Sequence, residues 1–275
     1  MKYQIHKNNW TIIFDKSNDI RNFSQSNIND VAKLIAKHTV VVFKQQFLTI
    51  EEEIEVIKKF KNPRQFFPNT NEIDVGYKNC VIKNSDHILV RVTGEKDEDG
   101  NVGFTGNSPE LDWHCNDPVR SDRHPIVWLY GAKGTTGSRT TWNNNILSYI
   151  DLDLEYKEKV KDLKIVVRHL WNEEANTSYT PSVLHKNIAN QTGLYFPFKQ
   201  IKKFVDKSPE ESQTIIKYLG EFTTQEKYCY HHDWQDGDIV LSEQWLGIHK
   251  RWPCYSMQTR ILHRAVMDFP DQEYS

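Results

Sequence analysis

Cysteine is scarce in this 275-residue sequence, and its four cysteines stand far apart. Cys80, Cys115, Cys229 and Cys254 form no C-x-x-C pair. Structural zinc sites need closely spaced cysteines, and disulfide frameworks are typical of small secreted domains. The spacing therefore favours reduced thiols of an intracellular protein over a disulfide framework or a zinc site.

Long apolar runs and an excess of positive charge are also missing. No stretch approaches the roughly 20 apolar residues that span a bilayer, and residues 1–14 mix charge with aromatics, unlike the apolar core of a signal peptide. The formal net charge is −2, so the basic surplus typical of nucleic-acid-binding proteins is lacking. These absences predict a cytoplasmic protein with neither nucleic acid nor membrane as its partner.

The sequence contains no internal repeat, no low-complexity tract and no linker rich in proline, glycine and serine. Hydrophobic residues make up 38% of the chain and charged residues 26%, as in ordinary globular proteins. A chain of this length builds one large core or two small ones. We expect a single domain over residues 1–275.

Two helices are marked by capping boxes, and a third by its apolar spacing. Apolar residues between Ile28 and Ile35 recur at helical spacing, and the run Val40 to Phe43 then reads as a buried strand. Capping boxes at Thr49 to Glu52 and Ser208 to Glu211 predict two further helix starts.

Short runs rich in β-forming residues occupy much of the remaining chain, with glycines in the turns between them. Many short strands with a few helices favour a mainly β fold, a sandwich or barrel with helices packed outside. The predicted strands are Pro125 to Tyr130, Lys164 to His169, Tyr228 to His232, Ile239 to Ser242 and Thr259 to Met267.

A histidine and an amide lie two residues apart in the segment Leu111 to Pro118. On a strand, His114 and Asn116 share one face and Asp117 points the opposite way. A histidine with an oxygen donor two residues on provides two legs of a facial metal site if a third ligand comes from elsewhere. Such a pair is more often an ordinary surface or core pair.

The C-terminal part holds another histidine, His249, with an aspartate before it and two arginines after it. Asp238 and Arg260 each lie eleven residues from His249, which we expect in an irregular segment. Arg260 and Arg264 differ by four, so on the last predicted strand they face the same side. Buried guanidinium groups need anions. Either internal carboxylates pair with them, or one arginine holds a dicarboxylate and the other meets a substrate.

The ordered segments together resemble the taurine dioxygenase-like family of Fe(II)- and 2-oxoglutarate-dependent oxygenases, over about residues 31–268. Trp113 to Asn116 is similar to the stretch with the first iron ligand, usually Trp-His-x-Asp. The other similar segments are Val40 to Thr49, Gly137 to Trp142, Thr192 to Tyr195, Pro209 to Ser212 and His232 to Asp238.

The resemblance implies a double-stranded β-helix (jelly-roll) core and a site for Fe(II) and 2-oxoglutarate. By this resemblance, His114 and His249 bind the metal, Thr140 and Arg260 bind 2-oxoglutarate, and Arg264 contacts the substrate. It further implies O2 as co-substrate and hydroxylation of a small molecule, anionic or amino-acid-like. Assembly into a homo-oligomer is left open.

The third ligand departs from the family pattern, because Asn116 stands where an aspartate is usual. Asn116 either ligates through its carbonyl oxygen, or stands off and leaves a position for water or halide, as in carboxylate-lacking halogenases. Alternatively, a bulge ahead of Pro118 turns Asp117 inward, or iron chemistry is lost. The run Glu243 to Trp245 also departs from the family's Asp-Asn-Arg, which predicts a changed pocket wall. A non-catalytic anion-binding protein on the same fold is the rival hypothesis.

Overall fold

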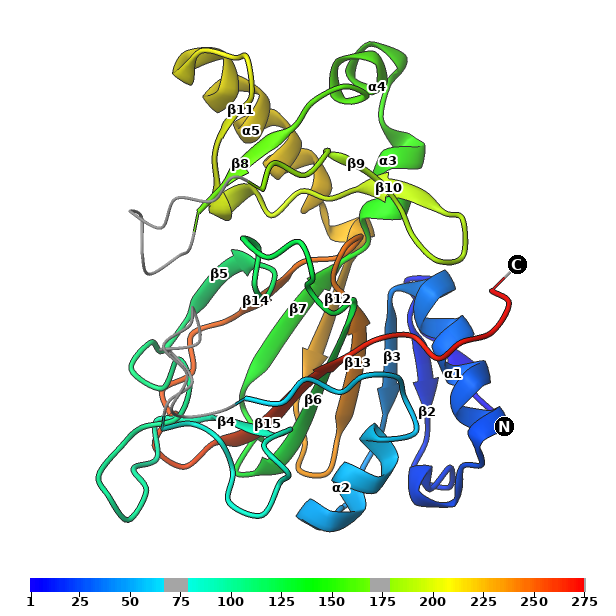
Figure 1. Ribbon diagram of the computed structural model, residues 1–275, viewed down its shortest axis with the longest axis vertical. Coiled ribbons are helices and arrows are strands. Elements are labelled where there is room, and N and C mark those ends of the chain that lie inside the picture. The colour runs from blue at the N-terminus through cyan, green and yellow to red at the C-terminus, as the bar shows by residue number, and fades with distance from the viewer. Residues whose placement is uncertain (67–78, 169–178, 275) are drawn as a thin grey trace.

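Short antiparallel strands carry most of the regular structure in the computed structural model, which describes residues 1–66, 79–168 and 179–274 (Figure 1). The largest sheet has seven strands, and only its β2 and β3 run parallel. Its strands, in spatial order, are β1 (Gln4–Ile5), β2 (Ile12–Phe14), β3 (Val40–Phe43), β13 (Ile239–Glu243), β6 (Ile126–Lys133), β15 (Ile261–Met267) and β4 (Val90–Val92).

A second sheet of four strands packs on the seven-stranded sheet through a shared layer of buried side chains. Its order is β12 (Cys229–Asp233), β7 (Arg139–Asn143), β14 (His249–Arg251) and β5 (Leu111–His114). Two small sheets pair β9 (Leu184–Lys186) with β10 (Thr192–Leu194) and β8 (Ile165–Val167) with β11 (Ile201–Phe204).

The helices lie outside the sheets. Figure 1 shows α1 (Gln25–His38) and α2 (Ile50–Ile57) beside the seven-stranded sheet, and the other helices with the two small sheets at the far end of the molecule. Those others are α3 (Asn145–Asp151), α4 (Leu154–Val160), α5 (Pro209–Thr223) and the 3-10 turns η3 (Phe198–Gln200) and η4 (Glu226–Tyr228); η1 (Ile20–Asn22) precedes α1. Among the described residues, no helix is both long and apolar enough to cross a lipid bilayer.

The predicted helices are confirmed, and their caps explain where they begin. Both capping boxes form in full: the hydroxyls of Thr49 and Ser208 each accept a hydrogen bond from the backbone N–H three residues on, and the carboxylates of Glu52 and Glu211 accept one from the backbone N–H of Thr49 and Ser208. The helix predicted around Ile28 to Ile35 is α1, whose apolar side lies in the core.

The predicted strands are confirmed as β3, β6, β8, β12, β13 and β15, with ends shifted by up to three residues; His169 lies outside the described residues. Two placements were wrong. His249 begins a strand, β14, instead of lying in an irregular segment, and Arg260 precedes β15 instead of lying within it. The backbone of Arg260 closes a turn on Ser256, which ends before the ladder with β6 starts.

Alternation along the strands of the large sheet separates two packed layers. On β6, Trp128 and Tyr130 pack with α1 and α2 on the outer side, whereas Val127 and Leu129 face the second sheet. The same alternation on β15 places Leu262 and Val266 in the layer between the sheets. A side chain on this inner face is therefore enclosed from both sides.

A buried aspartate ties the two sheets together where β13 begins. Asp238 is fully buried, and its carboxylate pairs with Lys44, just after β3, and with His232 of β12 at 3.1 Å. It also accepts the backbone N–H of Gln45 at 3.1 Å and of Gln235 at 3.2 Å. Burial by itself raises the pKa of Asp238, but the bonds from His232 and Lys44 outweigh it and hold the pKa below its usual range.

We expect Asp238→Asn to lower the free energy of unfolding by roughly 2–4 kcal/mol, because it removes the charge from a buried, fully used carboxylate. Chemical denaturation measures the loss. Asp233→Asn is the matched control, since that carboxylate pairs with Arg139 at the surface and contributes under about 1 kcal/mol. Because the pKa of Asp238 is lowered in the folded protein, this stabilisation is present at neutral pH and is lost as the pH falls below about 4. The unaltered protein and Asp238→Asn should therefore have similar free energies of unfolding at that pH. Equal losses in the two variants would contradict this role.

Candidate active site

Two histidines face each other across the β5 and β14 pair. His249 is the direct partner of His114 in the ladder, and the two ring centroids lie 4.2 Å apart. On its other side His249 pairs with Trp142 of β7, whose ring stacks on it at 6.1 Å. The central position of β14 between two strands therefore fixes the direction of the His249 side chain.

Both imidazoles are kept in the state that metals need. The Nδ1 atom of His114 lies 2.6 Å from the carbonyl oxygen of Asp112 and must carry the proton, because a carbonyl only accepts. This leaves Nε2 with its lone pair. Burial lowers the pKa of His114 to about 4 and holds the pKa of His249 well below its usual range. Both rings are neutral at physiological pH.

Asn116 lies beside these histidines in the same cavity. Its backbone N–H donates to the Oε1 atom of Gln244 at 2.9 Å, and its side-chain Oδ1 accepts from Nη1 of Arg264 at 3.3 Å. The Nδ2 atom is buried and has no hydrogen-bond partner within the described parts of the chain. Hydrogen bonds thus hold Asn116 at its backbone N–H and at its side-chain oxygen.

Arg260, just before β15 of the large sheet, and Thr140, on β7 of the second sheet, line the same cavity. Arg260 is 1% exposed, its Nε donates to Oγ of Ser138 at 3.0 Å, and its Nη1 finds no partner in the described residues. Burial lowers the pKa of Arg260 to about 10, so the group is still a cation at neutral pH. The Oγ1 atom of Thr140 accepts from Nε1 of Trp234 at 2.9 Å, which leaves the Thr140 hydroxyl hydrogen for another acceptor.

Arg264 and a third arginine complete a strongly cationic cavity of about 40 Å³. The Arg264 guanidinium lies 5.2 Å from the Phe104 ring and 5.6 Å from the Phe66 ring. Arg251 of β14 donates to the carbonyl oxygens of Thr105, at 3.1 Å, and Ser108. No aspartate or glutamate is among the described residues that line this cavity.

All six residues predicted for the site line this one cavity: His114, Asn116, Thr140, His249, Arg260 and Arg264. Asp117, the alternative donor, does not line it. Its backbone has φ +51° and its carboxylate pairs with Nη1 of Arg64 at 2.9 Å. Within the described chain, no group of three histidine, cysteine or acidic residues is placed to hold a metal.

The predicted change in the pocket wall at Glu243 to Trp245 was wrong, because none of these residues lines the cavity. They lie behind it. Gln244 connects the N–H of Asn116 to the carbonyl of His124, and Glu243 is buried with its carboxylate on the N–H groups of Trp245 and Leu246 at 2.9 and 2.8 Å. Burial raises the pKa of Glu243 to about 7. The segment supports Asn116 instead of shaping the cavity.

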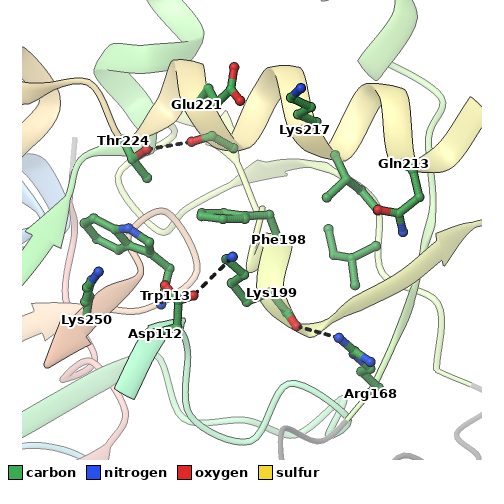
Figure 2. Close-up of a pocket in the computed structure, with 13 residues that line it drawn as sticks. Asp112, Trp113, Arg168, Phe198, Lys199, Gln213, Lys217, Glu221, Thr224 and Lys250 are labelled. Atoms are coloured by element: carbon green, nitrogen blue, oxygen red, sulfur yellow. Dashed lines mark hydrogen bonds and ion pairs between the residues drawn. The ribbon is translucent and has the colours of Figure 1, made fainter. Parts of the chain in front are cut away.

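A larger cavity of about 620 Å³ lies on the outer side of the second sheet, bordered by α5, η3 and the strands β5 and β14 (Figure 2). Figure 2 shows Asp112 paired with Lys199, at 3.1 Å. None of the six predicted residues lines this cavity. It borders the site at Asp112, whose carbonyl orients His114.

Three supporting residues were not predicted: Ser138, Gln244 and Arg251. Arg251 follows His249 by two on one strand, so strand alternation would have placed both on one face. Ser138 lies in the segment singled out for Thr140, but only the fold brings it to Arg260. Gln244 contacts Asn116 across 128 residues of chain, and no local pattern signals such a pair.

Comparisons with known proteins identify the family of the chain. Residues 14–266 match the family described as taurine catabolism dioxygenase TauD, TfdA family. The chain is 24% identical over 272 residues to the (S)-phenoxypropionate/alpha-ketoglutarate-dioxygenase of Sphingobium herbicidovorans, covering 86% of this chain and 85% of that protein. It is 22% identical over 214 residues to pentalenolactone F synthase of Streptomyces arenae, covering 68% and 71%.

Solved structures confirm the jelly-roll core. AAD-2 in complex with Mn(II) and N-oxalylglycine superimposes with a TM-score of 0.80 at 18% identity, covering 98% of both chains. A taurine dioxygenase from Burkholderia xenovorans superimposes with a TM-score of 0.75 at 17% identity, covering 94% of this chain and 86% of that one. Because the family match spans nearly the whole chain, this protein belongs to the TauD/TfdA family of Fe(II)- and 2-oxoglutarate-dependent dioxygenases.

Proposed function

We propose that this dioxygenase hydroxylates a small anionic substrate at a metal held by His114, His249 and Asn116, with 2-oxoglutarate held by Arg260 and Thr140. The observation that carries the proposal is the convergence of these side chains on one cavity, in which no lining residue of the described chain is a carboxylate. A metal cation and carboxylate ligands are the groups that such a donor set binds.

The residues fit a divalent metal. Two neutral imidazoles in direct register offer Nε2 of His114 and the ring of His249, and the Asn116 carbonyl oxygen is a third, weaker donor. When bound, the metal and 2-oxoglutarate supply the oxidising chemistry with O2. The chain binds them, orients them and excludes water.

The residues also fit the co-substrate. The Nη1 atom of Arg260 is a buried cationic donor without a partner among the described residues, and such burial costs free energy unless an anion accepts its hydrogen bond. A carboxylate there receives a charge-assisted hydrogen bond from Arg260, and the Thr140 hydroxyl is placed to donate a second. Ser138 orients the guanidinium from behind.

Arg264 is the residue that we propose for the substrate's anionic group. It is buried on the inner face of β15, on the same side as Leu262. Two of the similar proteins carry names of carboxylate substrates, (S)-phenoxypropionate and 2,4-dichlorophenoxyacetate, which supports a carboxylate or a similar anion here. We also propose a cytoplasmic location, in line with the free cysteines.

Replacing His114 or His249 with alanine should abolish metal binding, because each supplies one of only two nitrogen ligands. Calorimetric titration with Mn(II) measures it, and succinate formation from 2-oxoglutarate with iron and candidate substrates reports turnover. His263→Ala is the matched control, since that ring pairs with Glu53 on the outer face. Stoichiometric metal in both histidine variants would refute the site. Metal-dependent binding of anions without any succinate would instead support a non-catalytic binding protein.

Arg260→Ala should weaken 2-oxoglutarate binding by at least roughly tenfold, because it removes a charge-assisted fork in a buried cavity. Ser138→Ala leaves the charge in place but removes the group that orients it, so its loss should be only several-fold. Ser121→Ala, on the surface, should have no effect. Fluorescence or calorimetric titration with 2-oxoglutarate gives the three values. An unchanged affinity in Arg260→Ala would reject this assignment.

Asn116→Asp should tighten divalent-metal binding on the order of tenfold, because a carboxylate is a charged oxygen donor and an amide is neutral. Titration of both proteins with Mn(II), with and without 2-oxoglutarate, measures the change. The gain should be larger without 2-oxoglutarate, whose own charge offsets the missing carboxylate. If the position serves a halide, the same change should suppress any chlorinated product. Unchanged metal affinity would mean that residue 116 lies out of reach of the metal.

A further inference from the structure

The amide of Asn116 is oriented by a residue that we propose for substrate binding. A guanidinium has no acceptor atoms, so the contact of 3.3 Å between Nη1 of Arg264 and Asn116 requires the amide oxygen. The amide nitrogen is then the atom left in the cavity, buried and without a partner in the described residues. The chemistry of Arg264 therefore fixes which end of the amide is engaged.

The same oxygen is the atom that a metal would need. An amide has one acceptor oxygen, whereas its nitrogen is a donor and ligates no metal in this state. A guanidinium cation and a divalent metal at one oxygen repel each other, and none of the described residues that line the cavity is a carboxylate that would offset this repulsion. Arg264 and the metal thus compete for Asn116.

We infer that Arg264 is a positioning residue that withholds the Asn116 oxygen from the metal until an anionic substrate engages the guanidinium. This rests on the proposed function, in which His114 and His249 bind the metal and Arg264 meets the substrate. An anion at Arg264 neutralises its charge, offers it a stronger acceptor than an amide, and releases the oxygen. Substrate and metal then strengthen each other's binding by the same factor.

The surroundings of Arg264 allow such an exchange. Its guanidinium lies near the faces of Phe66 and Phe104, contacts that survive small shifts of the side chain. Asn116 is held from behind by Gln244 through its backbone, independently of Arg264. Loss of the Arg264 contact therefore leaves the Asn116 backbone in place and frees only its side chain.

Titration with Co(II), whose absorption reports its coordination, tests the inference without knowledge of the substrate. Arg264→Met should bind Co(II) roughly tenfold more tightly than the unaltered protein, because a charged hydrogen bond no longer occupies the oxygen. Arg251→Met is the matched control, since it also removes a guanidinium from the cavity, but one whose hydrogen bonds go to Thr105 and Ser108. Arg251→Met should raise the Co(II) affinity distinctly less than Arg264→Met does. Circular dichroism checks that both variants fold.

The Asn116→Ala background separates competition for the oxygen from general charge repulsion. There, Arg264→Met should improve Co(II) binding no more than Arg251→Met does. Methanesulfonate, an anion that coordinates metals poorly, should tighten Co(II) binding to the unaltered protein at constant ionic strength, but not to Arg264→Met.

Equal gains in Arg264→Met and Arg251→Met would overturn the inference, as would a methanesulfonate effect that persists in Arg264→Met. Either result leaves the proposed metal site intact. By contrast, Co(II) affinity that is unaffected by His114→Ala and His249→Ala would refute the proposed function itself.

Discussion

The site depends on the position of β14 between β5 and β7. Pairing with β5 sets His249 opposite His114, and pairing with β7 sets the same residue opposite Trp142 and Arg251 opposite Thr140. Hydrogen bonds on both edges of β14 hold this register, so the two imidazoles meet without any flexible loop between them. A shift of one residue would turn His249 out of the cavity and bring Lys250 in.

Much of this arrangement could be predicted from the sequence because it follows from local rules. The capping boxes at Thr49 and Ser208 mark helix starts through contacts three residues apart. Asn116 does line the same cavity as His114, but β5 ends at His114, so strand alternation is not what places Asn116 there. What local rules could not supply are contacts across the fold. Gln244 at Asn116 and Ser138 at Arg260 join segments more than 100 residues apart, and the strand at His249 exists only because two neighbouring strands flank it.

Charge gives the cavity its chemical character. Three guanidinium groups and two neutral histidines share a buried space in which no described lining residue is acidic. Burial lowers the pKa of Arg251 and Arg260 to about 10, so both are still cations at neutral pH, and the repulsion between them destabilises the fold. Anionic ligands relieve that repulsion. A cavity of this kind therefore selects for anions before any contact of shape is considered.

The replacement of the family's usual aspartate by Asn116 changes how residue 116 and Arg264 interact. A carboxylate has two oxygens, so one can accept from a guanidinium while the other ligates a metal, and its charge is attracted to both. The amide has a single oxygen and no net charge. Its oxygen lies 3.3 Å from Nη1 of Arg264, and the positive charge beside it makes it a poorer donor to a metal cation than an amide oxygen without that contact. With an aspartate, the contacts of residue 116 with Arg264 and with a metal would support each other, whereas with Asn116 they compete. We infer that an anion bound to Arg264 relieves this competition.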